Sequence, residues 1–323
     1  MRALRNIAIL TSGGDAPGMN ACTRAIVRTG IASGYRMFGV EYAYQGLVDG
    51  KFQSLGSRDV GNIISQGGTT LGAGRSTAFK TPEGLARALE MIRATEIDAL
   101  IIQGGDGSLR GAQALSEAGV SVIGIPASID NDVSGTSYSI GFDTALNTVL
   151  DAIRRLRDTA RSHNRIVIVE VMGRACGEIA LRAGVAGGAE VILVPEHPTD
   201  LPAVAAQLLD GRRRGKRFSI VVLAEGAGHA YDVQAKLEAV DVELKSTVTV
   251  LGHIQRGGDP TAFDIIVASE MGYRAVKALQ QGQRNVMVSY SKGDYSLVPI
   301  PEVNEGSKRF DEELFDLSQI LAR

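Results

Sequence analysis

Two neighbouring apolar runs in this chain each end in a loop of small and acidic residues. Residues 99–102 lead into GGDGS (104–108), and residues 120–125 lead into PASIDND (126–132), with a helix-like segment between the two runs. Apolar runs without polar alternation are typical of strands covered on both faces, and a strand–helix–strand order favours a parallel pair. Loops at the carboxyl ends of parallel strands form the ligand crevice of an α/β sheet. We therefore expect the chemistry of this chain at these two loops.

The same pattern occurs along most of the chain. A long helix is predicted at 143–162, and strands are predicted at 5–10, 99–102, 120–125, 165–171, 190–194, 218–224 and 247–251. Six of these runs end in a polar loop: TSGGD, GGDGS, PASIDND, MGR, EGAG or GHIQRGG. If the sheets are parallel, their carboxyl edges gather charged side chains around shared clefts and form a polar active site. These side chains are Asp106, Asp130, Asp132, Arg174, Glu225, His253 and Arg256.

The composition argues against several kinds of protein. A formal net charge of −2 disfavours general binding to nucleic acid or to a membrane surface. Cys22 and Cys176 are far apart and form no CxxC motif, and the four histidines show no metal-binding spacing, so we expect neither a disulfide framework nor a structural zinc. No stretch is apolar enough for a signal-peptide core or a transmembrane helix. The sequence thus predicts a cytoplasmic protein in a reducing environment.

Two glycine-rich segments are candidates for phosphate binding. Gly13 and Gly14 precede a helix that we expect to start near Pro17, where backbone N–H groups and the helix dipole favour an anion. Taken alone, a glycine pair at a strand exit is more often a simple tight turn. The segment GAGRS (72–76) lacks the third glycine of the dinucleotide-binding motif, and no Walker sequence is present. The common nucleotide motifs are therefore absent.

Carboxylates, arginines and glycine-rich loops, without a Ser–His or Cys–His pairing, favour phosphoryl transfer. This reaction needs a metal-holding carboxylate, backbone amides for the phosphates, a base for the attacking hydroxyl and cations for the developing charge. Asp106 lies within a glycine turn and suits Mg²⁺, which takes one or two carboxylates together with phosphate oxygens. Ser128, Asp130 and Asp132 form a polar cluster in which one aspartate would be the base. Arg174 would stabilise the transferred group.

Five motifs occur in order over nearly the whole chain: TSGGDAPGMN (11–20), GGDGS (104–108), IDND (129–132), EVMGR (170–174) and LGHIQRGG (251–258). Together, and at this spacing, they resemble bacterial ATP-dependent 6-phosphofructokinase. The resemblance implies an α/β fold of two Rossmann-like three-layer domains with mainly parallel sheets and the active site in the cleft between them. The larger, ATP-binding domain would comprise 1–141 and 254–304, and the smaller, fructose-6-phosphate-binding domain 142–253 and 305–323. A homotetramer is implied as well.

The resemblance also implies a reaction and its site residues. The family transfers the γ-phosphoryl group of MgATP to the 1-hydroxyl of fructose 6-phosphate. Asp130 would be the base beside Ser128 and Asp132, Asp106 would hold Mg²⁺, and Arg174 would stabilise transferred charge. ATP would contact Gly14, Arg75, Ser76, Gly105, Asp106, Gly107 and Ser108. The sugar phosphate would contact Ser128, Asp130, Arg165 (from a neighbouring subunit), Met172, Gly173, Arg174, Glu225, His253 and Arg256.

An allosteric site for ADP or phosphoenolpyruvate lies between subunits in this family. Its residues map onto Arg24, Arg28, Arg58, Arg157, Glu190, Arg214 and Lys216. The resemblance implies that these side chains bind the effector phosphate. The alternative interpretation is a solvated helix surface or a salt-bridged subunit interface.

Three places depart from the family pattern. The family's PGTIDND is here PASIDND: Ser128 keeps a hydroxyl, whereas Ala127 adds a methyl group near the phosphate path. Thr247 stands where an arginine normally reaches the sugar 6-phosphate across the subunit interface, a loss of about 1.5–3 kcal/mol for which Lys245 could compensate. At the effector site, Ser57 takes a usual arginine position, with an arginine adjacent to it.

Other functions stay open at this point. Pyrophosphate-using relatives carry Asp at the position of Gly107 and Lys at the position of Ala127, so this chain favours ATP. Ala127 and Thr247 also fit a weakly active or regulatory paralogue that binds sugar phosphate or nucleotide. The intact Asp106, Asp130 and Arg174 argue against it. A nicotinamide dehydrogenase is disfavoured because its glycine fingerprint is missing.

Overall fold

The structure is a computed structural model that describes residues 4–322, so residues 1–3 and 323 of the predicted domain ranges lie outside the described residues. It has the predicted α/β architecture with mainly parallel sheets. The chain divides into two compact units, a larger one of Met1–Thr144 with Arg256–Lys308 and a smaller one of Ala145–Gln255 with Arg309–Arg323. Each unit is therefore built from two separate stretches of chain. The assignment of ATP to one domain and of the sugar phosphate to the other stays a prediction.

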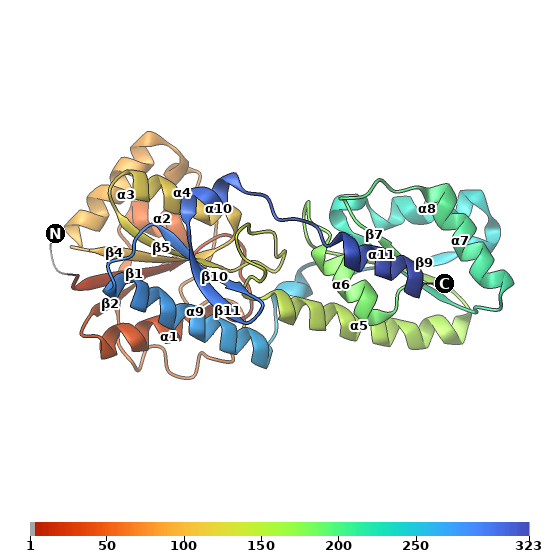
Figure 1. The fold of residues 1–323 in the computed structure, drawn as a ribbon, viewed down its shortest axis with the longest axis horizontal. Helices are drawn as coiled ribbons and strands as arrows, with labels where there is room; N and C mark the ends of the chain where they lie inside the picture. The colour runs from red at the N-terminus through yellow and green to blue at the C-terminus, as the bar shows by residue number, and fades with distance from the viewer. Residues whose placement is uncertain (1–3, 323) are drawn as a thin grey trace. The chain divides into compact units, whose positions relative to one another are not determined.

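The larger unit is organised around a seven-stranded sheet (Figure 1). Its strands are β1 (Asn6–Thr11), β2 (Arg36–Val40), β3 (Phe52–Leu55), β4 (Ala99–Gly104), β5 (Ser121–Pro126), β10 (Val286–Ser291) and β11 (Asp294–Pro299). They lie in the order β11-β10-β5-β4-β1-β2-β3. The inner strands run parallel, whereas β3 pairs antiparallel with β2 and β11 with β10. Strands β1 and β4 are buried along their whole length, which explains their unbroken apolar sequence.

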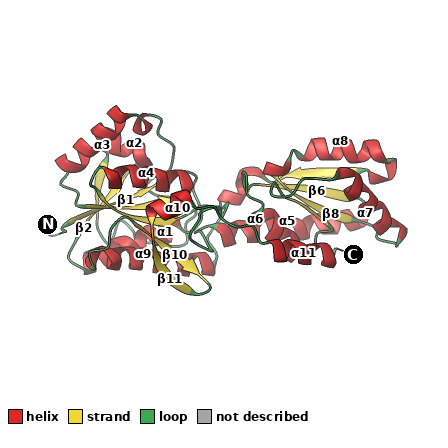
Figure 2. Ribbon diagram, turned by 45° about the horizontal axis from the view of Figure 1, so that its top comes forward, coloured by secondary structure: helices red, strands yellow, loops and turns green. Residues whose placement is uncertain are grey.

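Helices cover both faces of this sheet. They are α1 (Met19–Ala32), α2 (Ala43–Asp49), α3 (Pro82–Ala94), α4 (Asp106–Glu117), α9 (Ala262–Gln280) and α10 (Ile300–Glu305), with the short 3₁₀ helix η1 (Ala78–Lys80). Helices α1 and α9 pack together on one face, and α2, α3, α4 and α10 lie on the other (Figures 1 and 2). Leu10 and Leu100 of the sheet pack with Leu47 and Leu115 of the helices in a fully buried core. This three-layer arrangement exposes the strand ends, where the polar loops emerge.

The smaller unit repeats the plan with four parallel strands. These are β6 (Ile166–Val171), β7 (Val191–Leu193), β8 (Ser219–Ala224) and β9 (Ser246–Val250), in the order β7-β8-β6-β9. Helices α7 (Leu201–Arg213) and α8 (Ala230–Val240) cover one face, and α5 (Phe142–His163), α6 (Glu178–Gly187) and α11 (Glu312–Leu321) the other. The 3₁₀ helices η2 (Glu225–Ala227), η3 (Val242–Leu244) and η4 (Gly252–Arg256) follow β8, α8 and β9. Ile168, Val221 and Leu237 lie in its core.

The elements predicted from the sequence agree with the structure in large part. The seven predicted strands correspond to β1 and to β4 through β9, within two residues at each end, and the predicted helix at 143–162 is α5. On α1, Met19, Cys22 and Ile26 are buried against the sheet, as the spacing predicts. The sequence does not predict β2, β3, β10 and β11. These strands are partly exposed and lie toward the two edges of the sheet, where apolar runs are short.

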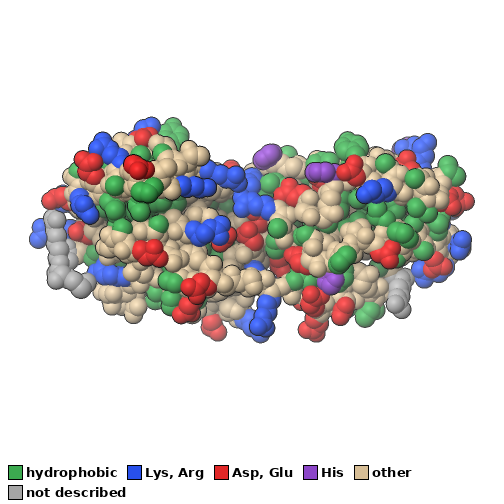
Figure 3. Space-filling view, turned by 90° about the horizontal axis from the view of Figure 1, so that it is seen from above, with side chains coloured by type: hydrophobic (Ala, Val, Ile, Leu, Met, Phe, Trp, Pro, Cys, Tyr) green, Lys and Arg blue, Asp and Glu red, His purple; other side chains and the backbone are tan. Residues whose placement is uncertain are grey.

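The surface carries charges of both signs. Basic and acidic side chains are interspersed with apolar ones over the face drawn in Figure 3, in keeping with the small net charge of −2. Within residues 4–322, none of the helices combines the length and the apolar character that crossing a membrane requires.

Candidate active site

The loops after β1 and β4 lie side by side at the carboxyl edge of the larger sheet. The two strands are neighbours, but the chain leaves β1 toward β2 and leaves β4 toward β5, in opposite directions. Such a topological switch point opens a crevice between the loops. The N–H of Ser12 donates to the Gln103 carbonyl (2.9 Å), and the N–H of Gly13 donates to the Gly74 carbonyl (3.3 Å). The structure thus brings together the two glycine-rich segments that the sequence singles out.

Gly104, the last residue of β4, is a point of very close approach between the loops. A Cβ atom there would lie 2.6 Å from the Ser12 carbonyl oxygen and 2.6 Å from Cβ of Ser108. The Gly104 carbonyl also accepts the N–H of Ala127 at 3.0 Å, which joins the loop after β5 to the same place. Only glycine fits at position 104 without displacing one of these loops.

Ser128, Asp130 and Asp132 form a hydrogen-bonded cluster after β5. The Ser128 Oγ donates to Oδ1 of Asp132 (3.3 Å) and accepts the N–H of Asp130 (3.3 Å). Asp130 is only 1% exposed. A Cβ built at Gly105 would lie 3.4 Å from Cβ of Ser128, so the cluster adjoins the GGDGS loop. The polar cluster predicted from the sequence is therefore a single structural group.

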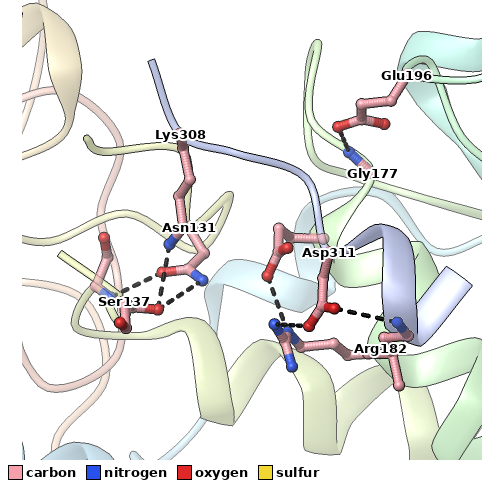
Figure 4. Close-up of polar contacts among 10 residues, drawn as sticks. Asn131, Ser137, Gly177, Arg182, Glu196, Lys308 and Asp311 are labelled. Carbon is pink, nitrogen blue, oxygen red and sulfur yellow. Dashed lines mark hydrogen bonds and ion pairs between the residues drawn. The ribbon is translucent and has the colours of Figure 1, made fainter. Parts of the chain in front are cut away.

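Asn131 fixes the turn that carries the two aspartates. Its backbone has φ 53°, a left-handed conformation that asparagine tolerates. Its Oδ1 accepts the N–H of Ser139 (2.9 Å), and its Nδ2 donates to the Ser137 carbonyl (3.2 Å). Lys308 Nζ donates to the same carbonyl at 3.2 Å (Figure 4). The segment that leaves α10 thus braces the loop of Asp130.

Asp106, the first residue of α4, is the candidate metal ligand. Its carboxylate forms an ion pair with Arg110 one turn later (2.5 Å). Among the residues that the structure describes, no group of three His, Cys, Asp or Glu could hold a metal by itself. One carboxylate at a helix N-terminus matches the donor set of Mg²⁺ that is held mainly by nucleotide phosphates and water. The residues present therefore fit the predicted metal.

Side chains of α2 support the predicted ATP loops. The Tyr44 hydroxyl donates to the Ser108 carbonyl at 2.6 Å, and burial raises the pKa of Tyr44, which keeps the phenol protonated as a donor. The Ser76 Oγ donates to Oε1 of Gln45 (2.8 Å) and accepts a backbone N–H (3.0 Å), so this hydroxyl is engaged inside the protein. Arg75, the residue before it, is exposed. The predicted pair thus consists of one internal anchor and one accessible cation.

Arg256 lies against Gly14. A Cβ atom at Gly14 would occupy the position of the Arg256 guanidinium group, so the side chain covers the glycine backbone. Arg256 ends η4 and belongs to the larger unit. Within the described chain, its buried Nε has no hydrogen-bond partner. A guanidinium N–H of this kind beside a glycine loop is suited to an anionic ligand.

In the smaller unit, the loop after β6 carries Gly173 and Arg174. Oε1 of Glu225, the residue after β8, accepts the N–H of Gly173 (3.2 Å) and the N–H of Arg174 (2.8 Å). Arg174 has φ 52°, which is uncommon for a residue other than glycine, and its side chain is exposed. Strained backbone of this kind clusters at functional sites. The structure brings Arg174 and Glu225 together, as the sequence predicts.

Two further side chains hold the same region. Oε1 of the fully buried Gln255 accepts the N–H of Met172 (3.2 Å), which joins the MGR loop to η4, where His253 is exposed. Oε1 of Glu196 accepts the N–H of Gly177 (2.8 Å) just before α6 (Figure 4). Sequence reasoning misses both contacts, because a single Gln or Glu in a loop carries no local pattern. In the sequence, the one signal for the contact of Gln255 is its place within the motif GHIQRGG.

The opposite end of the smaller sheet carries Arg165, Lys245 and Thr247. Arg165 directly precedes β6 and Lys245 directly precedes β9, whose first residues pair in register. Thr247 is the second residue of β9, and all three side chains are exposed. The six residues of β6 span roughly 20 Å at about 3.3 Å per residue. Within one chain, Arg165 therefore lies far from Arg174 at the other end of this strand.

The predicted effector residues fall into two groups. Arg24, Arg28 and Arg58 belong to the larger unit, and Arg157, Glu190, Arg214 and Lys216 to the smaller one. In the smaller unit, Lys216 lies 3.5 Å from the Glu190 carboxylate and Arg214 lies 3.1 Å from that of Asp210. Arg157 donates to the Gly188 carbonyl (3.1 Å). All three contacts lie within one chain, and the effector role and the subunit interface both stay predictions.

Comparison with known proteins decides the family. The family model described as Phosphofructokinase matches residues 6–279. The ATP-dependent 6-phosphofructokinase of Clostridium botulinum (strain Loch Maree / Type A3) is 47% identical over 321 residues, covering 99% of this chain and 100% of that protein. This chain belongs to the phosphofructokinase family. The protein of the same name from Clostridium tetani (strain Massachusetts / E88) is 48% identical over 319 residues, with 99% and 100% coverage.

Solved phosphofructokinases share this fold. The Saccharomyces cerevisiae phosphofructokinase matches with a TM-score of 0.87 and 35% identity over 98% of this chain, which spans about half (48%) of the yeast chain. A pyrophosphate-dependent phosphofructokinase from Marinobacter aquaeolei has a TM-score of 0.85 at 22% identity, over 96% of this chain and 86% of that one, which shows the shared fold alone. The family and the fold class expected from the five motifs are both confirmed.

Proposed function

We propose that this phosphofructokinase transfers the γ-phosphoryl group of ATP to the 1-hydroxyl of fructose 6-phosphate, giving fructose 1,6-bisphosphate and ADP in glycolysis. Its Clostridium relatives are named for the ATP-dependent activity and match over their full length. The observation that carries the proposal is the contact between the GGDGS loop and the Ser128–Asp130–Asp132 cluster. A kinase needs its phosphate-binding loop and its base next to each other.

Asp130 is the base in this proposal. Its carboxylate takes the proton of the 1-hydroxyl while that oxygen forms a bond to the γ-phosphorus. The bond from the γ-phosphorus to the oxygen bridging the β- and γ-phosphates breaks, and ADP leaves. Ser128 and Asp132 hold the cluster that orients this carboxylate. A positioned base contributes about 10²–10⁴-fold to the rate.

The larger unit provides the nucleotide contacts. The backbone N–H groups at Gly14 and along 105–107 face the phosphates in this proposal, with Ser108 beside them, Arg75 as a cation and Ser76 as an anchor for that segment. Asp106 would hold Mg²⁺, which neutralises phosphate charge when it is bound. Gly107 and Ala127 favour ATP over pyrophosphate. Ala127 is 1% exposed, which supports accommodation of its methyl group inside the fold.

The sugar contacts come from Met172, Gly173, Arg174, Glu225, His253 and Arg256. In this proposal, Arg174 stabilises the transferred charge, Glu225 binds sugar hydroxyls, and Arg256 and His253 bind the 6-phosphate. Arg165 lies at the far end of β6 and would serve the site of a neighbouring subunit. This arrangement calls for an oligomer, and we propose a homotetramer.

We also propose a regulated, cytoplasmic enzyme. ADP or phosphoenolpyruvate would bind Arg24, Arg28, Arg58, Arg157, Glu190, Arg214 and Lys216. Cys22 and Cys176 are far apart in the sequence and form no CxxC motif, which supports a reducing compartment.

The test measures fructose 1,6-bisphosphate formed with MgATP and, separately, with pyrophosphate, over a wide range of fructose 6-phosphate concentrations. We expect turnover with ATP and none with pyrophosphate. Asp130→Ser should abolish turnover and leave ATP binding intact in a calorimetric titration. Absence of product with ATP at millimolar sugar phosphate would refute the proposed activity, and an active Asp130→Ser enzyme would refute the role of Asp130.

A further inference from the structure

Asp264 is a fully buried carboxylate that the proposed reaction does not use. It lies in the first turn of α9 and is 0% exposed. Its Oδ1 accepts the N–H of Gly141 (2.8 Å), and its Oδ2 accepts both the N–H (2.8 Å) and the hydroxyl (2.5 Å) of Thr144. Gly141 and Thr144 belong to the N-terminus of α5. One helix therefore supplies the N-terminal cap of another through a buried charge.

The capping is reciprocal. Thr261, the residue before α9, accepts the N–H of Asp264 on its Oγ1 (3.2 Å) and donates from this hydroxyl to Oδ2 of Asp143 (2.7 Å). The N–H of Thr261 donates to Oγ1 of Thr144 (3.1 Å). The two helix starts are thus joined by bonds in both directions. Two positive helix N-termini meet here, and a carboxylate is the group that their dipoles favour.

The hydrogen bonds between the two helix starts end at Gly141, one residue away from a segment that is bonded to the loop of Asp130. Gly141 follows Ile140, whose N–H donates to the Pro126 carbonyl (3.0 Å) and whose carbonyl accepts the N–H of Ser128 (3.1 Å). Ile140 is therefore bonded on both sides of position 127, where the chain leaves β5. Fixing Gly141 fixes Ile140, and Ile140 fixes the start of the catalytic loop.

The chemistry of the site requires an ionised acceptor. Three donors converge on one carboxylate, and an asparagine would present its NH₂ group to at least one of them. Desolvation raises the pKa of Asp264 to about 6, whereas the bonds from Thr144 and Gly141 lower it. The titratable groups beside it are the carboxylate of Asp143 and the phenol of Tyr138, which burial keeps protonated and uncharged by raising its pKa. Burying a charged carboxylate costs free energy. The protein keeps this carboxylate nevertheless, which indicates that the positions of the groups bonded to it matter.

We propose that Asp264 is a positioning residue for phosphoryl transfer, which holds Gly141 and Thr144 so that Ile140 sets the position of the Ser128–Asp130–Asp132 loop. This inference rests on the proposed role of Asp130. Asp264 touches none of the reacting atoms, so its removal affects the orientation of the base and not the binding of ATP. Displacement of a reacting group by about 1 Å costs on the order of 100-fold in rate.

The test compares Asp264→Asn with Asp98→Asn in the full-length enzyme. Asp98 is a matched control in the same unit, because its carboxylate accepts the N–H groups of Arg5 (2.8 Å) and Asn6 (2.9 Å) at the opposite end of β4. We expect Asp264→Asn to lower kcat by about 10–100-fold with the KM for ATP within about threefold of wild type. It should also speed amide hydrogen exchange within 126–141, and Asp98→Asn should do neither.

A second pair of variants covers the case in which Asp264→Asn does not fold. Thr144→Val deletes one donor to Asp264, and Thr144→Ser restores it. We expect kcat to fall in the first and to return to near wild type in the second. Unchanged kcat and unchanged exchange within 126–141 in folded Asp264→Asn or Thr144→Val would overturn the inference. The exchange result does not depend on which residue is the base, so an active Asp130→Ser enzyme would refute the proposed role of Asp130 separately.

Discussion

In the larger unit, the loops after β1, β4 and β5 are joined to one another by main-chain hydrogen bonds, with Gly104 packed between them. In the smaller unit, the loop after β6 is held by side chains instead, as where Glu225 accepts the N–H groups of Gly173 and Arg174. Main-chain bonds survive the loss of any one side chain but need two backbones to approach closely. A side-chain acceptor is lost in one substitution. The loops of the larger unit should therefore be displaced by substitutions that block the close backbone approach, and the loop after β6 by substitutions that remove a side-chain acceptor.

The largest effect is expected at the close approach in the larger unit. In Gly104→Ala, the new methyl group collides with the Ser12 carbonyl and with Ser108, so two loops must move. We expect kcat to fall by about 100-fold and the free energy of unfolding to fall by about 1–3 kcal/mol. Gly56→Ala is the control, because its Cβ would meet only Oδ2 of Asp59, at 3.4 Å. Steady-state kinetics with near-normal kcat in Gly104→Ala would show that the loops are not rigidly joined.

A smaller and more selective effect is expected at the side-chain anchor of the other unit. Glu225→Ala removes the acceptor of two N–H groups, at a cost of about 1–3 kcal/mol, so the KM for fructose 6-phosphate should rise by about 10–100-fold. The KM for ATP should stay within about twofold. Glu225→Gln keeps a neutral acceptor, so its KM for fructose 6-phosphate should lie between that of the wild type and that of Glu225→Ala. Equal increases in the KM for fructose 6-phosphate and the KM for ATP would contradict a selective role of this side-chain anchor in the smaller unit.

The smallest effect is expected at the amino end of the smaller sheet. Thr247 is exposed at the start of β9, in the strand next to the one that Arg165 precedes. Thr247→Arg should lower the half-saturating concentration of fructose 6-phosphate by about 10-fold, the lower part of the range for a charged hydrogen bond, because the arginine loses rotamer freedom. Thr247→Lys is the matched control for charge alone. An unchanged half-saturating concentration in Thr247→Arg would mean that this edge does not face the sugar phosphate.

The inner strands could be predicted from the sequence because burial on both faces leaves no polar residue in them. Strand β11 shows why others could not: its sequence, DYSLVP, is mostly exposed and pairs antiparallel at the sheet edge, so it has no continuous apolar run. Strand order is likewise absent from local patterns. It places β4 beside β1 although more than eighty residues separate them, and this pairing creates the crevice.

The candidate site was predictable where its residues occur in short motifs. The cluster of Ser128, Asp130 and Asp132 lies within five consecutive residues, and its internal bonds follow from that proximity. Asp264 shows the limit of this approach. It is one of two acidic residues in α9, the other being Glu270, and its partners lie 120 and 123 positions away in the sequence. Only the folded structure, which joins the N-termini of α9 and α5 by hydrogen bonds, reveals these partners.

The division of the chain into interleaved units affects how it folds during synthesis. The larger unit lacks α9, β10 and β11 until the ribosome has made all of Ala145–Gln255, which takes roughly 5–20 s at about 5–20 residues per second. The smaller unit lacks α11 until the end, where Asp311 pairs with Arg182 of α6 at 3.2 Å (Figure 4). The larger unit therefore exposes apolar surface until residues 256–308 have been made, and the smaller unit keeps one side of α6 uncovered until α11 packs against it.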